Sequence, residues 1–128
     1  MTKPAPLPTP SAPPAAGPYS PAMRAGGWIV LSGQLGLGPD GVLVEGGVVA
    51  QTERAMANVG AVLADCDAVW ADVVRVALYL TDLSAMPGVN ACYEAVLGGH
   101  RPARTTIGVA ALPMGAAIEV EAWVWHPQ

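Results

Sequence analysis

The sequence predicts an α+β fold in which one sheet carries two helices on a single face. Two segments have the helical spacing of apolar residues, strand-like segments separate them, and paired strands stand at both ends. The 128 residues have the length of one domain, so we expect a single domain over residues 1–128. Repeated prolines exclude a regular helix in residues 1–16, which we expect to form an extended arm.

The first strands are predicted from residues 28–37, which read WIVLSGQLGL. Apolar residues dominate this segment, and Ser32-Gly33 interrupts it, so we expect a strand that breaks in the middle. The GPDG sequence at 38–41 indicates a turn. The VLVEGG sequence at 42–47 then predicts a short strand that ends in glycines.

Two helices are predicted, over residues 48–66 and 84–97. Ser84 is a candidate N-cap for the second helix, and Gly98-Gly99 would end it. In the first helix the apolar residues form one face that we expect to be buried. The residues expected elsewhere on that helix are polar: Gln51, Glu53, Arg54 and Asn58.

Three further strands are predicted at residues 72–80, 103–110 and 117–125, and LPMG separates the last two. The element order is therefore β-β-β-α-β-α-β-β, which predicts a mixed six-stranded sheet with both helices on one face.

The last strand shows what the uncovered face of the sheet carries. Successive side chains of a strand point to opposite faces. The side chains expected under the helices are Ile118, Val120, Ala122 and Val124, and those expected on the other face are Glu119, Glu121, Trp123 and Trp125. Since tryptophan is costly to expose and glutamate costly to bury unpaired, we expect a subunit interface with a polar cleft. A content of 52% hydrophobic and 12% charged residues favours a homo-oligomer over a dry, alanine-rich monomer.

The composition excludes several functions. The net charge is −4 and Lys3 is the only lysine, which argues against a nucleic-acid partner. No apolar run has the length of a membrane span, and the N-terminus lacks the apolar core of a signal peptide, so we expect a cytoplasmic protein. The two cysteines and two histidines are too few to predict a zinc site or a disulfide framework. Phosphate-loop, dinucleotide and GxSxG motifs are absent, so we expect no metal and no organic cofactor.

Arg104 and Glu119 are the charged residues that could carry chemistry inside apolar strands. A guanidinium binds a carboxylate through two hydrogen bonds, so Arg104 could bind a small carboxylate ligand. The alternative is a structural ion pair with Glu119 or Glu121. Glu119 in a partly dry cleft would have a raised pKa and could deprotonate water. It could equally be the partner of Arg104 or an interface acceptor.

Other candidates carry weaker signals. Tyr19 lies between prolines and could cap a cleft or anchor the arm. Ser32-Gly33 would permit close approach of a ligand to the backbone, or mark a bulge. Asn90 is a polar residue beside apolar ones on the second helix, although such residues are usually exposed. His100 is expected to lie in a surface loop, and Cys92 is expected to pack against its neighbours on the helix.

The sequence resembles the reactive intermediate deaminase (RidA/YjgF) family from about Gly17 to Val124. The matching segments, in order, are GPYSPA, LSGQLGL, NACYEAVL and RPARTTIGVAALPMGAAIEVEA. The resemblance implies a chorismate-mutase-like fold, a homotrimer with clefts between subunits, and hydrolysis of enamine and imine intermediates such as 2-aminoacrylate to 2-oxo acids and ammonia. It implies no cofactor.

The resemblance also implies roles for individual residues. Arg104 would bind the substrate carboxylate, and Glu119 would position the attacking water. Thr106 stands where many relatives have cysteine, so only a backbone contact carries over there. The residues implied to line the cleft are Tyr19, Ser32, Gly33 and Asn90.

Three functions follow as hypotheses. The first is the imine deaminase, with the small carboxylate-bearing imine or enamine as substrate. The second is a non-catalytic trimer that binds small carboxylates or acts as a chaperone-like partner. The third is an endoribonuclease, which the acidic chain makes electrostatically unfavourable.

Overall fold

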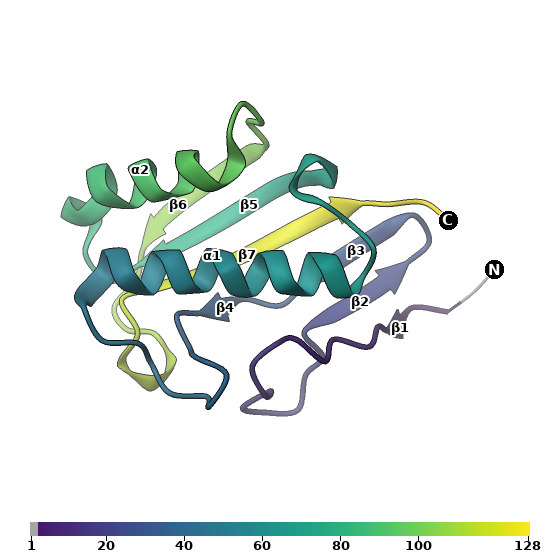
Figure 1. Ribbon diagram of the computed structural model, residues 1–128, viewed down its shortest axis with the longest axis horizontal. Coiled ribbons are helices and arrows are strands. Elements are labelled where there is room, and N and C mark those ends of the chain that lie inside the picture. The colour runs from purple at the N-terminus through teal and green to yellow at the C-terminus, as the bar shows by residue number, and fades with distance from the viewer. Residues whose placement is uncertain (1–2) are drawn as a thin grey trace.

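The computed structural model describes residues 3–128 and places α1 and α2 on the same face of one sheet (Figure 1). This confirms the predicted α+β arrangement. The helices are α1 (Gly47–Asp65) and α2 (Met86–Leu97). The strands are β1 (Ala5–Pro6), β2 (Ala22–Ala25), β3 (Trp28–Leu31), β4 (Gln34–Leu35), β5 (Val73–Leu80), β6 (Ala103–Gly108) and β7 (Ile118–Trp125).

The sheet has seven strands in the order β1-β2-β3-β7-β5-β6, and β4 also pairs with β7. It is mixed, as predicted, because β5 and β6 are parallel while the other pairs are antiparallel. Six strands were expected, but the one expected at 42–47 is not formed, and two further strands, β1 and β2, lie at the N-terminal edge. There, β2 forms a hairpin with β3 around Gly26, whose φ of 60° suits the tight turn.

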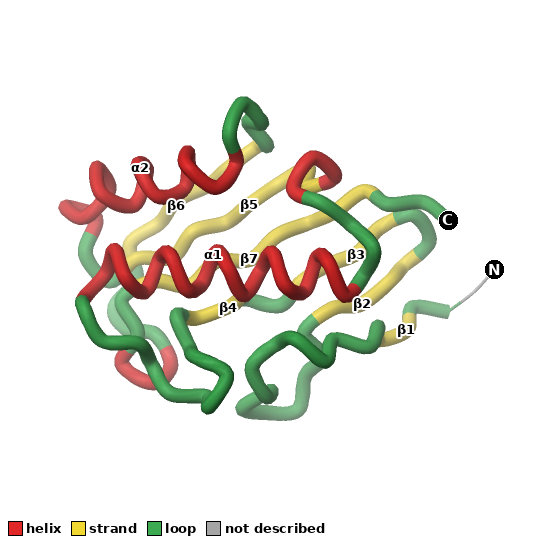
Figure 2. The backbone as a smooth tube through the Cα atoms, viewed as in Figure 1, coloured by secondary structure: helices red, strands yellow, loops and turns green. Residues whose placement is uncertain are grey.

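One expectation for the N-terminal half is wrong. The strand predicted at 42–47 is only an isolated bridge between Leu37 and Leu43, because the chain then enters α1 through Gly46 and Gly47 at positive φ. Part of the N-terminal arm forms the edge strand β1, which pairs with β2. A proline is tolerated in β1 because it is an edge strand. Figure 2 shows the loop that follows β1 passing near the C-terminal end of α1.

Helix α1 buries the predicted apolar face and also two polar residues that were expected elsewhere. Asn58 is fully buried and donates from Nδ2 to the carbonyls of Leu35 and Leu37, at 3.0 and 2.9 Å. Gln51 is buried and accepts a hydrogen bond from the amide of Ala117 at 2.8 Å. Because β4 has only two residues, Asn58 supplies the donors for the carbonyls of Leu35 and Leu37, while Gln51 supplies the acceptor for the amide just before β7.

Helix α2 begins later than expected. Asp82, rather than Ser84, is the N-cap of a 3-10 turn at Leu83–Ala85, and it accepts hydrogen bonds from the amide and the hydroxyl of Ser84 at 2.9 and 2.7 Å. The predicted end is confirmed, since the helix stops at Gly98 with φ of 61°.

The core lies between the sheet and the two helices. Ile118, Val120, Ala122 and Val124 of β7 are fully buried there, as the alternation predicted. Trp123 and Trp125 are 45% and 48% exposed on the opposite face. We call that uncovered side of the sheet the open face.

Candidate functional site

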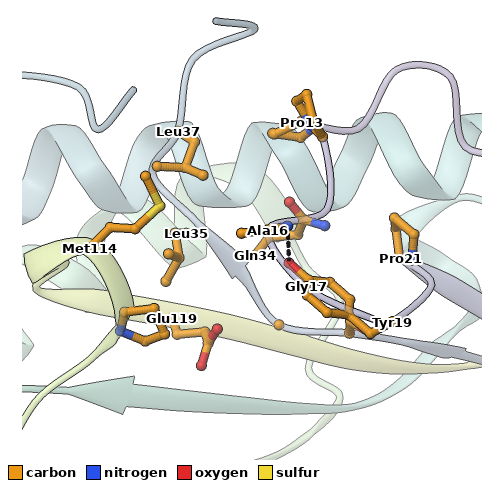
Figure 3. A pocket seen from close by; sticks show the side chains of 14 residues that line it. Pro13, Ala16, Gly17, Tyr19, Pro21, Gln34, Leu35, Leu37, Met114 and Glu119 are labelled. Carbon is orange, nitrogen blue, oxygen red and sulfur yellow. Dashed lines mark hydrogen bonds between the residues drawn. The ribbon is translucent and has the colours of Figure 1, made fainter. Parts of the chain in front are cut away.

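Four of the predicted site residues line one pocket of about 370 Å³ (Figure 3). We call Tyr19, Ser32, Gly33 and Glu119 the pocket cluster. They come from the loop before β2, the break between β3 and β4, and the start of β7. The rest of the wall is mostly apolar and consists of Pro13, Pro14, Ala16, Gly17, Pro21, Gln34, Leu35, Leu37, Pro113 and Met114.

Gly33 allows Glu119 to lie against the backbone. A Cβ at position 33 would be 2.6 Å from Cδ and 2.7 Å from Oε2 of Glu119. A side chain at position 33 would therefore force the Glu119 carboxylate to move, so the glycine allows the carboxylate to occupy this position. The close approach expected at Gly33 is therefore made by Glu119 itself.

The environment of Glu119 changes the acidity of its carboxyl group. Burial is the main cause that raises the pKa of its carboxyl group above the ordinary value, and the nearby Glu121 carboxylate raises it further. Glu121 lies on the same face and accepts a hydrogen bond from the hydroxyl of Tyr79. No donor within residues 3–128 bonds to Glu119, which leaves its oxygens available to a water molecule.

Tyr19 and Ser32 are held by local hydrogen bonds. Ser32 donates from Oγ to the carbonyl of Ser20 at 2.7 Å and from its amide to the carbonyl of Pro21 at 2.9 Å. The Tyr19 hydroxyl accepts from the amide of Ala16 at 3.3 Å, drawn as a dashed line in Figure 3. Its own proton remains available for donation. Ser32 therefore fixes the loop that carries Tyr19 at the pocket mouth.

Arg104 lies outside this pocket, exposed on the edge strand β6. Its guanidinium carbon is 4.9 Å from the centre of the Tyr93 ring. Within residues 3–128 the single ion pair joins Arg101 to Glu94, at 2.9 Å. The alternative that Arg104 pairs with Glu119 or Glu121 of its own chain is therefore wrong.

The strand register places Arg104 and Glu119 on opposite faces of the sheet. Arg104 lies beside Val76, which is fully buried under the helices. Glu119 lies beside Tyr79 of the open face. Neighbouring partners in a sheet point to the same side, and β5 separates β6 from β7. One copy of the chain does not bring the two groups together.

Asn90 and Thr106 also lie outside the pocket, on α2 and β6, and we call them, together with Arg104, the edge cluster. Asn90 is exposed on α2, one helical turn before Tyr93. Thr106 lies two residues after Arg104, on the same side of β6, and its buried Oγ1 has no hydrogen-bond partner within residues 3–128.

Comparison with known proteins shows to which family this chain belongs. The family described as Endoribonuclease L-PSP matches residues 9–125. The chain belongs to the RidA/YjgF family. It is 46% identical to Protein DfrA of Myxococcus xanthus over 87% of each chain, and 43% identical to a 2-iminobutanoate/2-iminopropanoate deaminase of Mus musculus over 89% of this chain and 85% of the relative. The crystal structure of RidA from the Antarctic bacterium Psychrobacter has a TM-score of 0.89 at 38% identity, over 93% of this chain and 97% of that one.

Two parts of this RidA-family site were not identified from the sequence. The arm was expected to be extended, yet its residues Pro13, Pro14 and Ala16 form part of the pocket wall. The sequence indicates LPMG only as a separator between strands, but Met114 lines the pocket and has φ of 61°. A bulky residue in the left-handed region is uncommon, and the following Gly115 at φ of 70° marks the sharp turn. The LPMG sequence carried that turn signal.

The histidine and the cysteines considered from the sequence do not line the pocket. His100 Nε2 lies 2.8 Å from the carbonyl oxygen of Val73, and Cys66 and Cys92 are free thiols. Across residues 3–128 there is no group of three or more histidine, cysteine, aspartate or glutamate side chains that could hold a metal ion. Within the same residues, none of the helices is both long and apolar enough to cross a bilayer.

Proposed function

We propose that this chain is a cofactor-independent deaminase that hydrolyses reactive enamines and imines, such as 2-aminoacrylate, to 2-oxo acids and ammonia. The observation that carries the proposal is that Arg104 has no carboxylate partner within residues 3–128, while Glu119 keeps a raised pKa beside a pocket. An imine that bears a carboxylate would give Arg104 its missing anionic partner and would give Glu119 an electrophilic carbon to which it can direct a water molecule. The deaminase name of the mouse relative supports this reading.

The reaction needs little more than these two groups. Arg104 binds the substrate carboxylate through paired hydrogen bonds. Glu119 takes a proton from water as the water oxygen attacks the imine carbon, and it passes that proton to the nitrogen to give a carbinolamine. The hydroxyl proton of the carbinolamine then passes to the nitrogen through the same carboxylate, so that the C–N bond breaks, ammonia leaves and the C=O bond forms. An enamine first takes a proton at its β-carbon and loses one from its nitrogen to become the imine. Because the imine carbon is already electrophilic, orientation and proton transfer are sufficient.

The site is completed by a second copy of the chain in this proposal, because Arg104 and Glu119 lie on opposite faces of one sheet. We infer a homotrimer in which the edge cluster of one subunit closes the pocket cluster of the next. Exposed apolar side chains on the open face support an interface there, and tryptophan is enriched in such surfaces. They are Trp28, Val30, Trp123 and Trp125.

The pocket wall favours a substrate with an apolar side chain. Glu119 is its only charged lining residue within residues 3–128, and Leu35, Leu37 and Met114 form the part beyond it (Figure 3). A hydrocarbon side chain packs there without leaving a charge unpaired, whereas an acidic side chain would face the Glu119 carboxylate.

The proposal is tested by turnover of imines made in situ by an amino-acid oxidase, with a chemical trap that reports the imine remaining. The decisive arm co-expresses Arg104→Ala and Glu119→Gln chains. Each homomer should be inactive. Randomly mixed trimers should recover about a quarter of wild-type activity, because one cleft in four then pairs an intact arginine with an intact glutamate across an interface.

Each outcome separates the hypotheses. No recovery on mixing would mean that both groups act from one subunit, or not at all. Binding of 2-oxo acids without turnover by the wild type would favour a carboxylate-binding trimer. RNA cleavage by highly purified protein, lost in Glu119→Gln, would favour the endoribonuclease.

A further inference from the structure

The cation–π contact with the Tyr93 ring restricts the conformation of the Arg104 side chain. Arg104 extends from an edge strand where most side chains are exposed, and no carboxylate within residues 3–128 binds it. A long side chain in that position would sample many rotamers. The ring of Tyr93, 4.9 Å from the guanidinium carbon, is the contact that limits them.

Tyr93 is itself rigidly held. It belongs to the core cluster under α2 and is only 7% exposed. Its hydroxyl is nevertheless buried with no hydrogen-bond partner within residues 3–128. An unpaired buried hydroxyl is unfavourable, so the contribution of Tyr93 comes from its ring. Burial is the main cause that raises the pKa of Tyr93, which keeps the ring neutral beside the cation.

We propose that Tyr93 is a positioning residue that acts through Arg104. The face of its ring holds the guanidinium in the orientation that meets the substrate carboxylate at the subunit interface. This inference rests on the proposed function for its substrate, but not for the contact itself. The aromatic face of Tyr93 orients the guanidinium, and the Tyr93 hydroxyl has no part in this role.

The test compares Tyr93→Leu, which keeps an apolar side chain but removes the ring, with Tyr93→Phe, which keeps the ring. Binding of 2-oxobutanoate by calorimetry and KM for an imine substrate are measured together with thermal unfolding. We expect Tyr93→Leu to weaken binding and raise KM by roughly 2- to 30-fold, with kcat changed little, since that range matches the strength of cation–π contacts. Tyr93→Phe should remain within about twofold of wild type.

Leu97→Ala is the matched control, because Leu97 is buried on the same helix one turn further on. It should lower the unfolding temperature, as Tyr93→Leu does, but leave 2-oxobutanoate binding unchanged. Equal weakening in Leu97→Ala and Tyr93→Leu would overturn the proposal, and so would a Tyr93→Phe variant as weak as Tyr93→Leu.

The two proposals can fail separately. A wild-type protein that binds 2-oxobutanoate but releases no 2-oxo acid from imines would reject the deaminase proposal. The role of Tyr93 would still be tested by the affinities of Tyr93→Leu and Tyr93→Phe for 2-oxobutanoate. Turnover with identical KM in Tyr93→Leu and wild type would reject only the role of Tyr93. A wild type that neither binds nor turns over would reject both.

Discussion

The pocket cluster and the edge cluster differ in how the chain supports them. The pocket cluster is enclosed by three segments, and Gly33, Ser20 and the arm fix Glu119, Ser32 and Tyr19 in place. The edge cluster lies on an outer strand and an exposed helix face, where the ring of Tyr93 is the main support of Arg104.

As a result, the Glu119 carboxylate and the Arg104 guanidinium lie in different environments. The carboxylate is partly buried, which raises its pKa and suits proton transfer. The guanidinium is exposed and stays charged, as carboxylate binding requires. A chain with both groups in one pocket could form an internal ion pair, whereas their position on opposite faces of the sheet keeps the two groups apart.

Glu119→Gln tests the pocket cluster most strongly. Removal of the base should lower kcat by about 10²- to 10⁴-fold. In the wild type, kcat/KM should rise with pH up to the raised pKa of Glu119 and level off above it, because only the ionised carboxylate accepts a proton. A rate independent of pH through this range, measured by 2-oxo acid release, would contradict the assignment.

Arg104→Ala tests the edge cluster. Loss of the paired hydrogen bonds to the carboxylate should cost about 3 to 4 kcal/mol, or roughly 100- to 1,000-fold in kcat/KM. Arg101→Ala is the control, because Arg101 binds Glu94 on the surface. Light scattering should show the same oligomer for both variants, and near-wild-type turnover by Arg104→Ala would remove the edge cluster from the mechanism.

The stability of the pocket cluster should depend on pH. The unfolded chain loses the Glu119 proton near pH 4.5, whereas the folded chain keeps it to a higher pH. Folding stability should therefore fall as pH rises through that window. Glu119→Gln should unfold at a higher temperature than wild type at pH 7, and the gap should close below pH 4.5. A gap of the opposite sign would show that the carboxylate is stabilised by the fold.

Met114→Ala tests whether the apolar wall of the pocket contacts the substrate side chain. Met114 is 52% exposed, so its truncation should cost about 1 kcal/mol of contact with a large substrate side chain, or roughly fivefold in kcat/KM. The loss should appear for the imine of leucine and be absent for that of alanine. An equal loss for both would exclude Met114 from side-chain selection.

Ser11→Ala should have the smallest effect. Ser11 attaches the arm to α1 through hydrogen bonds of 2.8 Å from its amide and its hydroxyl to Asp65. Loss of the hydroxyl should lower stability by about 0.5–1 kcal/mol and raise KM slightly, because the arm forms part of the pocket wall. Ser84→Ala removes a similar exposed bond to Asp82, far from the arm, and should leave KM unchanged.

Much of the fold could be predicted because its signals are local. The helical spacing of α1 and the alternation of β7 follow from which residues must leave water, and both predictions are confirmed. Strand β2 and the burial of Asn58 could not be predicted. The sequence AMRA has little strand signal by itself, and a buried asparagine depends on carbonyls more than twenty residues away.

The sequence by itself determined the chemistry that is available: a permanent cation at position 104, a carboxylate at position 119, and alternating faces that separate polar from apolar side chains. Only the tertiary structure decided which of these groups meet. Strand pairing placed β5 between β6 and β7, and so put Arg104 and Glu119 on opposite faces. Residue type fixes charge and hydrogen-bonding capacity, whereas distance and burial arise from contacts between segments far apart in the chain.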